Sequence, residues 1–336
     1  MSEFRIDQIT NQSGSRGPDI AGITTFSGTS GMVMPSGPTE YRGGRDRGVF
    51  GGGYTPTRVN TIDYITISTA GNALDFGDLY TQVNRGGTNS SSVRGLWGGG
   101  NTPSYVNVIQ YVTISSTGNS FDFGDLTIAR WATGGCSSST RGLWGGGYGS
   151  PQIASPANTA TIDYVTITTL GDASKFGDLT LSRRETAAFA SPTRGVWGGG
   201  KTPTTTNVID YVTISSLGNA LDFGDMTFSA GERAGCSNSI RGLFGGGNNA
   251  IDYITIASTG DAIDFGDLLA LGYQFLAACA SPIRGIFAGG GDNPPVLNNI
   301  EFVTIASTGN ASDFGDLTVA RLSLEGCSDA HGGLGD

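Results

Sequence analysis

The chain has 336 residues, a formal net charge of −10 and only 14% charged residues, and 56 of its residues are glycine. The acidic balance argues against nucleic acid as a partner, because binding a phosphate backbone needs clustered Lys and Arg. No apolar run approaches the roughly 18 residues of a membrane span, and the first ten residues lack the apolar core of a signal peptide.

Residues 1–46 do not repeat, and they mix short β-capable pieces with Gly, Ser and Pro. They hold too few apolar residues to bury a core of their own. We predict that they form an extended N-terminal arm that becomes ordered against another chain. The alternative is a disordered tail. The second domain is expected to span residues 47–336.

From Arg47 onward the sequence repeats. Each unit begins with an Arg-Gly pair, followed by an apolar residue, an aromatic residue and a glycine run, as in RGLWGGG at residues 94–100. The six pairs start at Arg47, Arg94, Arg141, Arg194, Arg241 and Arg284. Two further aromatics, such as Tyr111 and Phe123, stand 12 residues apart in every unit. Periods of 40 to 50 residues indicate propellers, solenoids or arrays.

Each unit contains four strand-like segments in order: GCSSST, RGLWGGG, IDYVTIS and ALDFGDL are examples. The third segment alternates apolar and polar residues and is rich in β-branched types, and a Gly-Asn or Gly-Asp turn follows it. We therefore predict an all-β fold, a six-bladed β-propeller with four strands per blade. The segment around Cys327 is expected to pair with the strand that starts at Arg47, so that N- and C-terminal strands close the ring.

The glycine run could cradle a phosphate, act as a linker or allow close strand packing. A phosphate loop follows one strand, opens a helix and usually occurs once per domain. Here the run recurs in every unit and no helical pattern follows it. We interpret it as a packing feature of the strands.

The motif DFGD also recurs, once as KFGD, and its last residue is Asp78, Asp125, Asp178, Asp225, Asp267 or Asp316. It resembles a magnesium-binding triplet of kinases, but the required sequence context is missing. Calcium binding is a second alternative, although no ligand-dense loop is present. We interpret these residues, with the six repeat arginines, as structural, and expect the carboxylates to accept backbone N–H groups or to pair with a repeat Arg.

Cysteine and histidine usage argues against catalysis. Cys136, Cys236, Cys279 and Cys327 occupy one repeat position and lack metal-ligand spacing, so we predict free thiols and no metal. His331 is the sole histidine, which excludes most Ser-His-Asp and zinc chemistry. We predict no cofactor and no enzymatic activity. Two converging loop carboxylates, as in glycosidases, remain the alternative.

The repeat resembles the kelch repeat. The shared features are the glycine run after an apolar–aromatic pair, the two spaced aromatics and a late arginine such as Arg130, Arg183 or Arg321. Phe stands where the kelch Trp would be, and a third Gly is added. The wording of the repeats is similar to kelch-like proteins of marine and cyanobacterial tailed phages. That resemblance implies a virion structural protein, made in the host cytoplasm, present in several copies and attached to other virion proteins through residues 1–46.

Loop lengths vary most between the glycine run and the third strand. In a four-strand meander these loops share one face with the loops that lead into the next unit. Aromatic and Arg side chains on such loops are typical recognition anchors. The candidate binding residues are Tyr54, Arg58, Tyr105, Trp131, Tyr148, Gln152, Arg184, Lys201, Arg233 and Tyr273. The expected partner is a host-surface glycan or protein, or another virion protein. The alternatives are a carbohydrate-active propeller enzyme, a capsid-cementing protein without a receptor role, and a cellular adaptor.

Overall fold

The structure is a computed structural model that describes residues 46–149, 157–269, 274–291 and 295–335. These residues belong to one compact unit, 45–336. The predicted arm lies outside the described residues except for Asp46. Among the described residues, the helical elements amount to a 3₁₀ turn, η2 (Gly332–Leu334), and none has the length and apolar character needed to cross a membrane.

The described strands form six four-stranded antiparallel sheets and one small three-stranded sheet. The innermost strands, a, are β27 (Glu325–Ser328), β4 (Gly87–Ser90), β9 (Gly134–Ser137), β15 (Ala187–Ala190), β19 (Ala234–Ser237) and β23 (Ala277–Ala280). The next strands, b, are β1 (Arg47–Gly51), β5 (Arg94–Gly98), β10 (Arg141–Gly145), β16 (Arg194–Gly198), β20 (Arg241–Gly245) and β24 (Arg284–Ala288).

The outer strands complete each sheet. Strands c are β2 (Thr61–Thr66), β6 (Val108–Thr113), β13 (Thr161–Thr166), β17 (Val208–Thr213), β21 (Ala250–Thr255) and β25 (Asn299–Thr304). Strands d are β3 (Leu74–Asp78), β7 (Phe121–Asp125), β14 (Ser174–Asp178), β18 (Leu221–Asp225), β22 (Ile263–Asp267) and β26 (Ser312–Asp316). The small sheet joins β8 (Arg130–Trp131), β11 (Tyr148–Gly149) and β12 (Ala157–Asn158).

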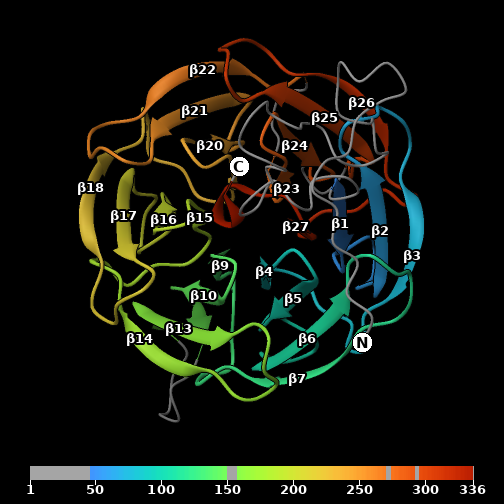
Figure 1. The fold of residues 1–336 in the computed structure, drawn as a ribbon, viewed down its shortest axis with the longest axis horizontal. Helices are drawn as coiled ribbons and strands as arrows, with labels where there is room; N and C mark the ends of the chain where they lie inside the picture. The colour runs from blue at the N-terminus through green and yellow to red at the C-terminus, as the bar shows by residue number, and fades with distance from the viewer. Residues whose placement is uncertain (1–45, 150–156, 270–273, 292–294, 336) are drawn as a thin grey trace, which may run out of the picture. The chain divides into compact units, whose positions relative to one another are not determined.

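The sheets surround a common centre, as in a propeller (Figure 1). Their inner strands contact one another in the cyclic order β4, β9, β15, β19, β23, β27 and back to β4. Strand β27, from the C-terminal end, pairs with β1, and Val49 lies opposite Cys327. The predicted pairing of the segment around Cys327 with the Arg47 strand is confirmed. The all-β, propeller-like fold follows from these pairings.

The glycine run allows neighbouring sheets to approach closely. A Cβ on Gly98 would lie 2.6 Å from the ring of Trp144 in the next sheet. The indole Nε1 of Trp144 donates a hydrogen bond of 2.9 Å to the carbonyl oxygen of Gly87. The glycine therefore makes room for a large aromatic side chain at the joint, which supports the packing interpretation.

The repeat arginines connect each sheet to the next. Arg94 Nη1 donates to the carbonyl oxygen of Ile167 at 2.8 Å, and its guanidinium lies 4.9 Å from the ring centre of Tyr111. The same hydrogen bond recurs from Arg47, Arg141, Arg194, Arg241 and Arg284. The bond from Arg284 reaches Ile67 in the first sheet, so the series closes on itself.

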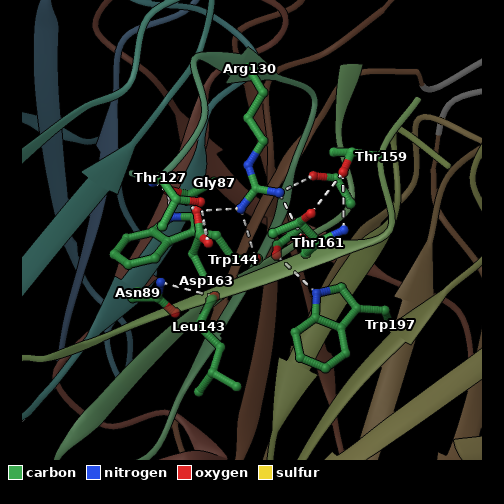
Figure 2. Close-up of polar contacts among 12 residues, drawn as sticks. Gly87, Asn89, Thr127, Arg130, Leu143, Trp144, Thr159, Thr161, Asp163 and Trp197 are labelled. Atoms are coloured by element: carbon green, nitrogen blue, oxygen red, sulfur yellow. Dashed lines mark hydrogen bonds and ion pairs between the residues drawn. The ribbon is translucent and has the colours of Figure 1, made fainter. Parts of the chain in front are cut away.

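A second set of arginines is buried inside the sheets. Arg130 Nη2 lies 3.0 Å from the carboxylate of Asp163, both side chains are fully buried, and Arg130 also donates to the carbonyl oxygen of Thr161 at 2.7 Å (Figure 2). Thr127 Oγ1 donates to the same carboxylate at 2.7 Å. Equivalent pairs are Arg183–Asp210, Arg233–Asp252 and Arg321–Asp63.

These pairs correct the role expected for the DFGD carboxylates. The carboxylates that pair with arginine are on the c strands, whereas Asp125 and its equivalents are partly or fully exposed. The DFGD segment acts through its backbone. The N–H of Asp125 donates to Asp172 Oδ1 at 3.0 Å, and the carbonyl oxygen of Phe123 accepts from the N–H of Gly171 at 2.9 Å. The motif thus holds the c–d turn of the next sheet.

Candidate functional site

The b–c loops and the d–a segments lie together, because they pair with each other. Tyr54 pairs with Leu322, Asn84 with Asn101, and Arg184 with Lys201 as isolated β-bridges. In the third unit the same relationship extends into the small sheet, where Trp131 lies opposite Tyr148. Backbone hydrogen bonds therefore fix the loops that carry most of the predicted binding residues.

A ring of six residues lies where the d–a segments enter the inner strands. They are Arg85, Ala132, Glu185, Glu232, Phe275 and Ser323, with φ between 55° and 65°. The N–H of each residue donates to the carbonyl oxygen of the ring residue in the preceding sheet, at 2.6 to 3.2 Å, and the cycle is complete. We call this the mouth ring. A left-handed backbone is uncommon for residues other than glycine and costs roughly 1–3 kcal/mol when the surroundings impose it.

Charged side chains of the mouth ring form a network with Lys201. Lys201 Nζ lies 3.1 Å from Glu185 Oε2 and also donates to Glu232. Arg85 Nη1 lies 3.4 Å from Glu185 Oε1. Burial raises the pKa of Glu232, and Lys201 partly opposes this shift. Burial alone would lower the pKa of Lys201, but its hydrogen bonds to the two glutamates outweigh that effect and raise its pKa.

An aromatic cluster lies beside the network. It consists of Tyr105, Trp131 and Tyr148, whose ring centres are 6.0 to 6.4 Å apart. The guanidinium of Arg184 lies 5.3 Å from the ring centre of Tyr148, and that of Arg85 lies 4.8 Å from Trp131. Each of the three aromatics is only partly buried. The cluster therefore offers aromatic surface next to hydrogen-bonding and charged groups.

The structure thus brings five predicted residues together: Tyr105, Trp131, Tyr148, Arg184 and Lys201. Tyr54 and Arg58 pair with each other in the first b–c loop, and Arg58 Nε donates to the carbonyl oxygen of Asn101 at 3.1 Å. Gln152 and Tyr273 lie outside the described residues.

The prediction of Arg233 as a loop-surface residue is corrected. This side chain is 1% exposed and is paired with Asp252 in the interior. Its guanidinium occupies the role that Arg130 has in another sheet, although Arg233 lies three residues later in its unit. The position equivalent to Arg130 is Ala230, so the buried ion pair is built from a shifted position.

Sequence reasoning missed Arg85, Glu185, Glu232 and Phe275. A positional signal existed, because the mouth ring follows the second aromatic by nine residues in five units and by ten in the fifth. The residue type at this position varies, and none of the six is glycine. The residue types at this position do not predict a left-handed backbone conformation.

Stacking surfaces, ion pairs and hydrogen-bond donors suit non-covalent recognition. No group of three or more His, Cys, Asp or Glu side chains within the described ranges is arranged to hold a metal ion. Comparison with protein-family models and with curated proteins gave no match to this chain.

Proposed function

We propose that the protein is a non-catalytic recognition module built on a six-bladed, kelch-like β-propeller, and that it is a structural protein of a tailed-phage virion. Six four-stranded sheets whose inner strands contact one another in a cycle support the blade count. The virion assignment rests on the likeness of the repeats to phage kelch-like proteins. Under this proposal residues 1–46 attach the module to other virion proteins.

The observation that carries the recognition role is the aromatic cluster beside the charged mouth ring. Its residues come from loops that pair with one another through backbone hydrogen bonds. Such loops lose little conformational entropy when a ligand binds, which favours affinity. Aromatic and Arg side chains are the most frequent energetic anchors of interfaces. The expected ligand is a glycan or protein on the host surface.

Adsorption experiments test this function. Purified protein should compete with particles for the host cells, and replacement of Trp131 or Tyr148 by Ala should weaken the competition by at least about tenfold. Trp131→Phe keeps an aromatic ring and should retain most of the effect. Phe121→Ala, which removes an exposed aromatic side chain on the outer strand β7, is the matched control. Thermal unfolding verifies that each variant is folded.

Three results would contradict the proposal. If both Ala variants competed as well as the wild type, the aromatic cluster would not be the recognition site. Hydrolysis of host glycans that depends on one loop carboxylate would identify an enzyme instead. Normal adsorption with unstable capsids would indicate a cementing role.

Deletion of residues 1–46 should leave a folded propeller that no longer enters particles.

A further inference from the structure

The inner strands enclose a central cavity of about 130 Å³. At one end its lining includes Arg85 and Phe275 of the mouth ring, and the Arg85 guanidinium lies 3.9 Å from the ring centre of Phe275. At the other end lies His331, whose Nε2 is 3.0 Å from the carbonyl oxygen of Ser90. The turn η2 continues from His331 and contacts three inner strands, β9, β15 and β19.

One joint of this cavity departs from the repeat. The first residue of the inner strand is Glu325 in β27, whereas the other five strands begin with Gly87, Gly134, Ala187, Ala234 and Ala277. The residue that precedes the inner strand is Gly86 before β4, whereas the others are Thr133, Thr186, Arg233, Leu276 and Leu324. A large acidic residue thus replaces a small one on the first sheet, and a glycine replaces a larger residue on the second.

The two departures are complementary. At an equivalent joint a Cβ on Gly87 would lie 2.7 Å from Thr133 Oγ1, and at another a Cβ on Gly134 would lie 2.6 Å from Thr186 Oγ1. The residue that corresponds to these threonines in the second sheet is Gly86, which has no side chain. At the joint between β27 and β4, Gly86 therefore places no side chain against Glu325.

Glu325 has no ion-pair partner among the described residues. The other charged lining side chains, Arg85, Glu185, Glu232 and Arg233, each have an ion-pair partner. Within the described residues Glu325 has neither an ion pair nor a side-chain hydrogen bond. Burial raises the pKa of Glu325 well above its usual value, and the positive charge of Arg85 partly opposes this shift.

The same joint contains a buried donor without an acceptor. Trp144 and Trp197 donate from Nε1 to Gly87 and Gly134, the first residues of the inner strands. Trp97 would donate to the equivalent Glu325, but its Nε1 has no partner and the side chain is 1% exposed. The hydrogen bond seen at the two other joints is therefore missing here, and a buried donor without an acceptor calls for an explanation.

We propose that the central cavity binds a small molecule through its protonated amino group, with Glu325 as the anchoring carboxylate and Arg85 as the side chain that covers the entrance. A carboxylate that lines a cavity and has no ion-pair partner among the described residues is complementary to an ammonium group. One carboxylate supplies too few ligands for a divalent metal, whereas an ammonium group needs one anionic acceptor and polar neighbours. A cavity of this volume admits a ligand of a few heavy atoms.

Calorimetric titration with methylammonium and ethylammonium chloride tests this site in the full-length protein. Both amines should bind saturably, and Glu325→Gln should weaken binding by at least about 30-fold. Glu325→Ala restores the residue that begins three of the other inner strands, so it should fold and should not bind. Arg85→Ala should accelerate association and dissociation, because it opens the entrance.

The pH dependence of binding provides an independent readout. The amine binds the ionised carboxylate, so wild-type affinity should fall as the pH is lowered toward the pKa of Glu325, and Glu325→Gln should lack this dependence. The other titratable groups that line the cavity are Arg85, Glu185, Glu232, Arg233, His331 and the four cysteines. Tyr148→Ala, which leaves the cavity lining intact, should bind the amines normally even where it impairs host adsorption.

Absence of saturable methylammonium binding would overturn the proposal, as would equal binding by the wild type and Glu325→Gln. Neither result would affect the proposed recognition function, because that function depends on the aromatic cluster. Conversely, loss of adsorption in Tyr148→Ala would leave the amine site untouched.

Discussion

The Nη2 atom of Arg321 lies 3.1 Å from Asp63 Oδ2 in the interior of the first sheet, and both side chains are fully buried. The two residues come from opposite ends of the described chain, so this ion pair holds those ends together within one sheet. Thr318 Oγ1 donates to the same carboxylate. Asp63, near the start of the described chain, is therefore neutralised by a residue near its end.

Breaking this pair should strongly destabilise the fold. Arg321→Val leaves a buried carboxylate unpaired, which costs about 3–5 kcal/mol of unfolding free energy. The chain supplies its own matched control, because the second sheet has Val83 and Gln110 at the two equivalent positions, and both are buried. The double variant Arg321→Val with Asp63→Gln should recover at least half of the loss. Urea unfolding of the single and double variants measures the coupling, and additive losses would contradict this account.

Substitution at the d strand should be far more damaging than at the adjoining turn. A Cβ on Gly124 would lie 2.5 Å from the backbone of Gly171 in the next sheet, whereas a Cβ on Gly118 would meet nothing within 4 Å. Both glycines have similar backbone angles, with φ of 146° and 153°. Gly124→Ala should therefore lose about 1–3 kcal/mol more than Gly118→Ala, because the clash adds to the shared strain. Equal losses in denaturant unfolding would show that the joint can relax.

His331 should make stability depend on acidic pH. Burial lowers its pKa from 6.5 to about 4, so below pH 6.5 the unfolded state takes up a proton that the folded state does not. The contribution of His331 to stability is therefore complete above pH 6.5, falls as the pH drops toward 4, and levels off below that. The full effect is on the order of 3 kcal/mol. The difference in unfolding free energy between wild type and His331→Gln should shrink from pH 7 to pH 4.5. A constant difference would refute the assignment.

The cysteines should be inert in the folded protein. All four are buried and free, and burial raises the pKa of Cys236 to about 12. The thiolate is the reactive form, so thiol reagents should label none of them at pH 8 until the protein unfolds. Mass spectrometry after a short iodoacetamide pulse, with and without urea, measures this. Rapid labelling of Cys236 in the native protein would contradict the prediction.

Much of the architecture could be predicted from the repeat. The alternation in the IDYVTIS segments identified the c strands, and the missing inner strand of the first unit identified the pairing of β27 with β1. The role of the glycine run followed from its recurrence. These inferences succeeded because each unit repeats the same local pattern, so that six copies report on one structure.

The partners of charged side chains required the tertiary structure. The DFGD carboxylates occur in six units and those of the c strands in five, and only burial shows that Asp163 and its equivalents receive the arginines. Arg233 reaches its carboxylate from a shifted position, which no spacing rule anticipates. Ion pairs join residues from separate strands, so their identity depends on how those strands are packed.

The sequence by itself determined the all-β class, the unit boundaries and the location of the variable loops, since these depend on short-range periodicity. Only the tertiary structure decided which loop residues meet: the aromatic cluster combines three separate loop segments, and the mouth ring combines residues of six. Glu325 became notable only when the inner strands could be compared at one joint. Contacts of this kind depend on the closure of the ring, which brings residues far apart in the chain to the same central axis.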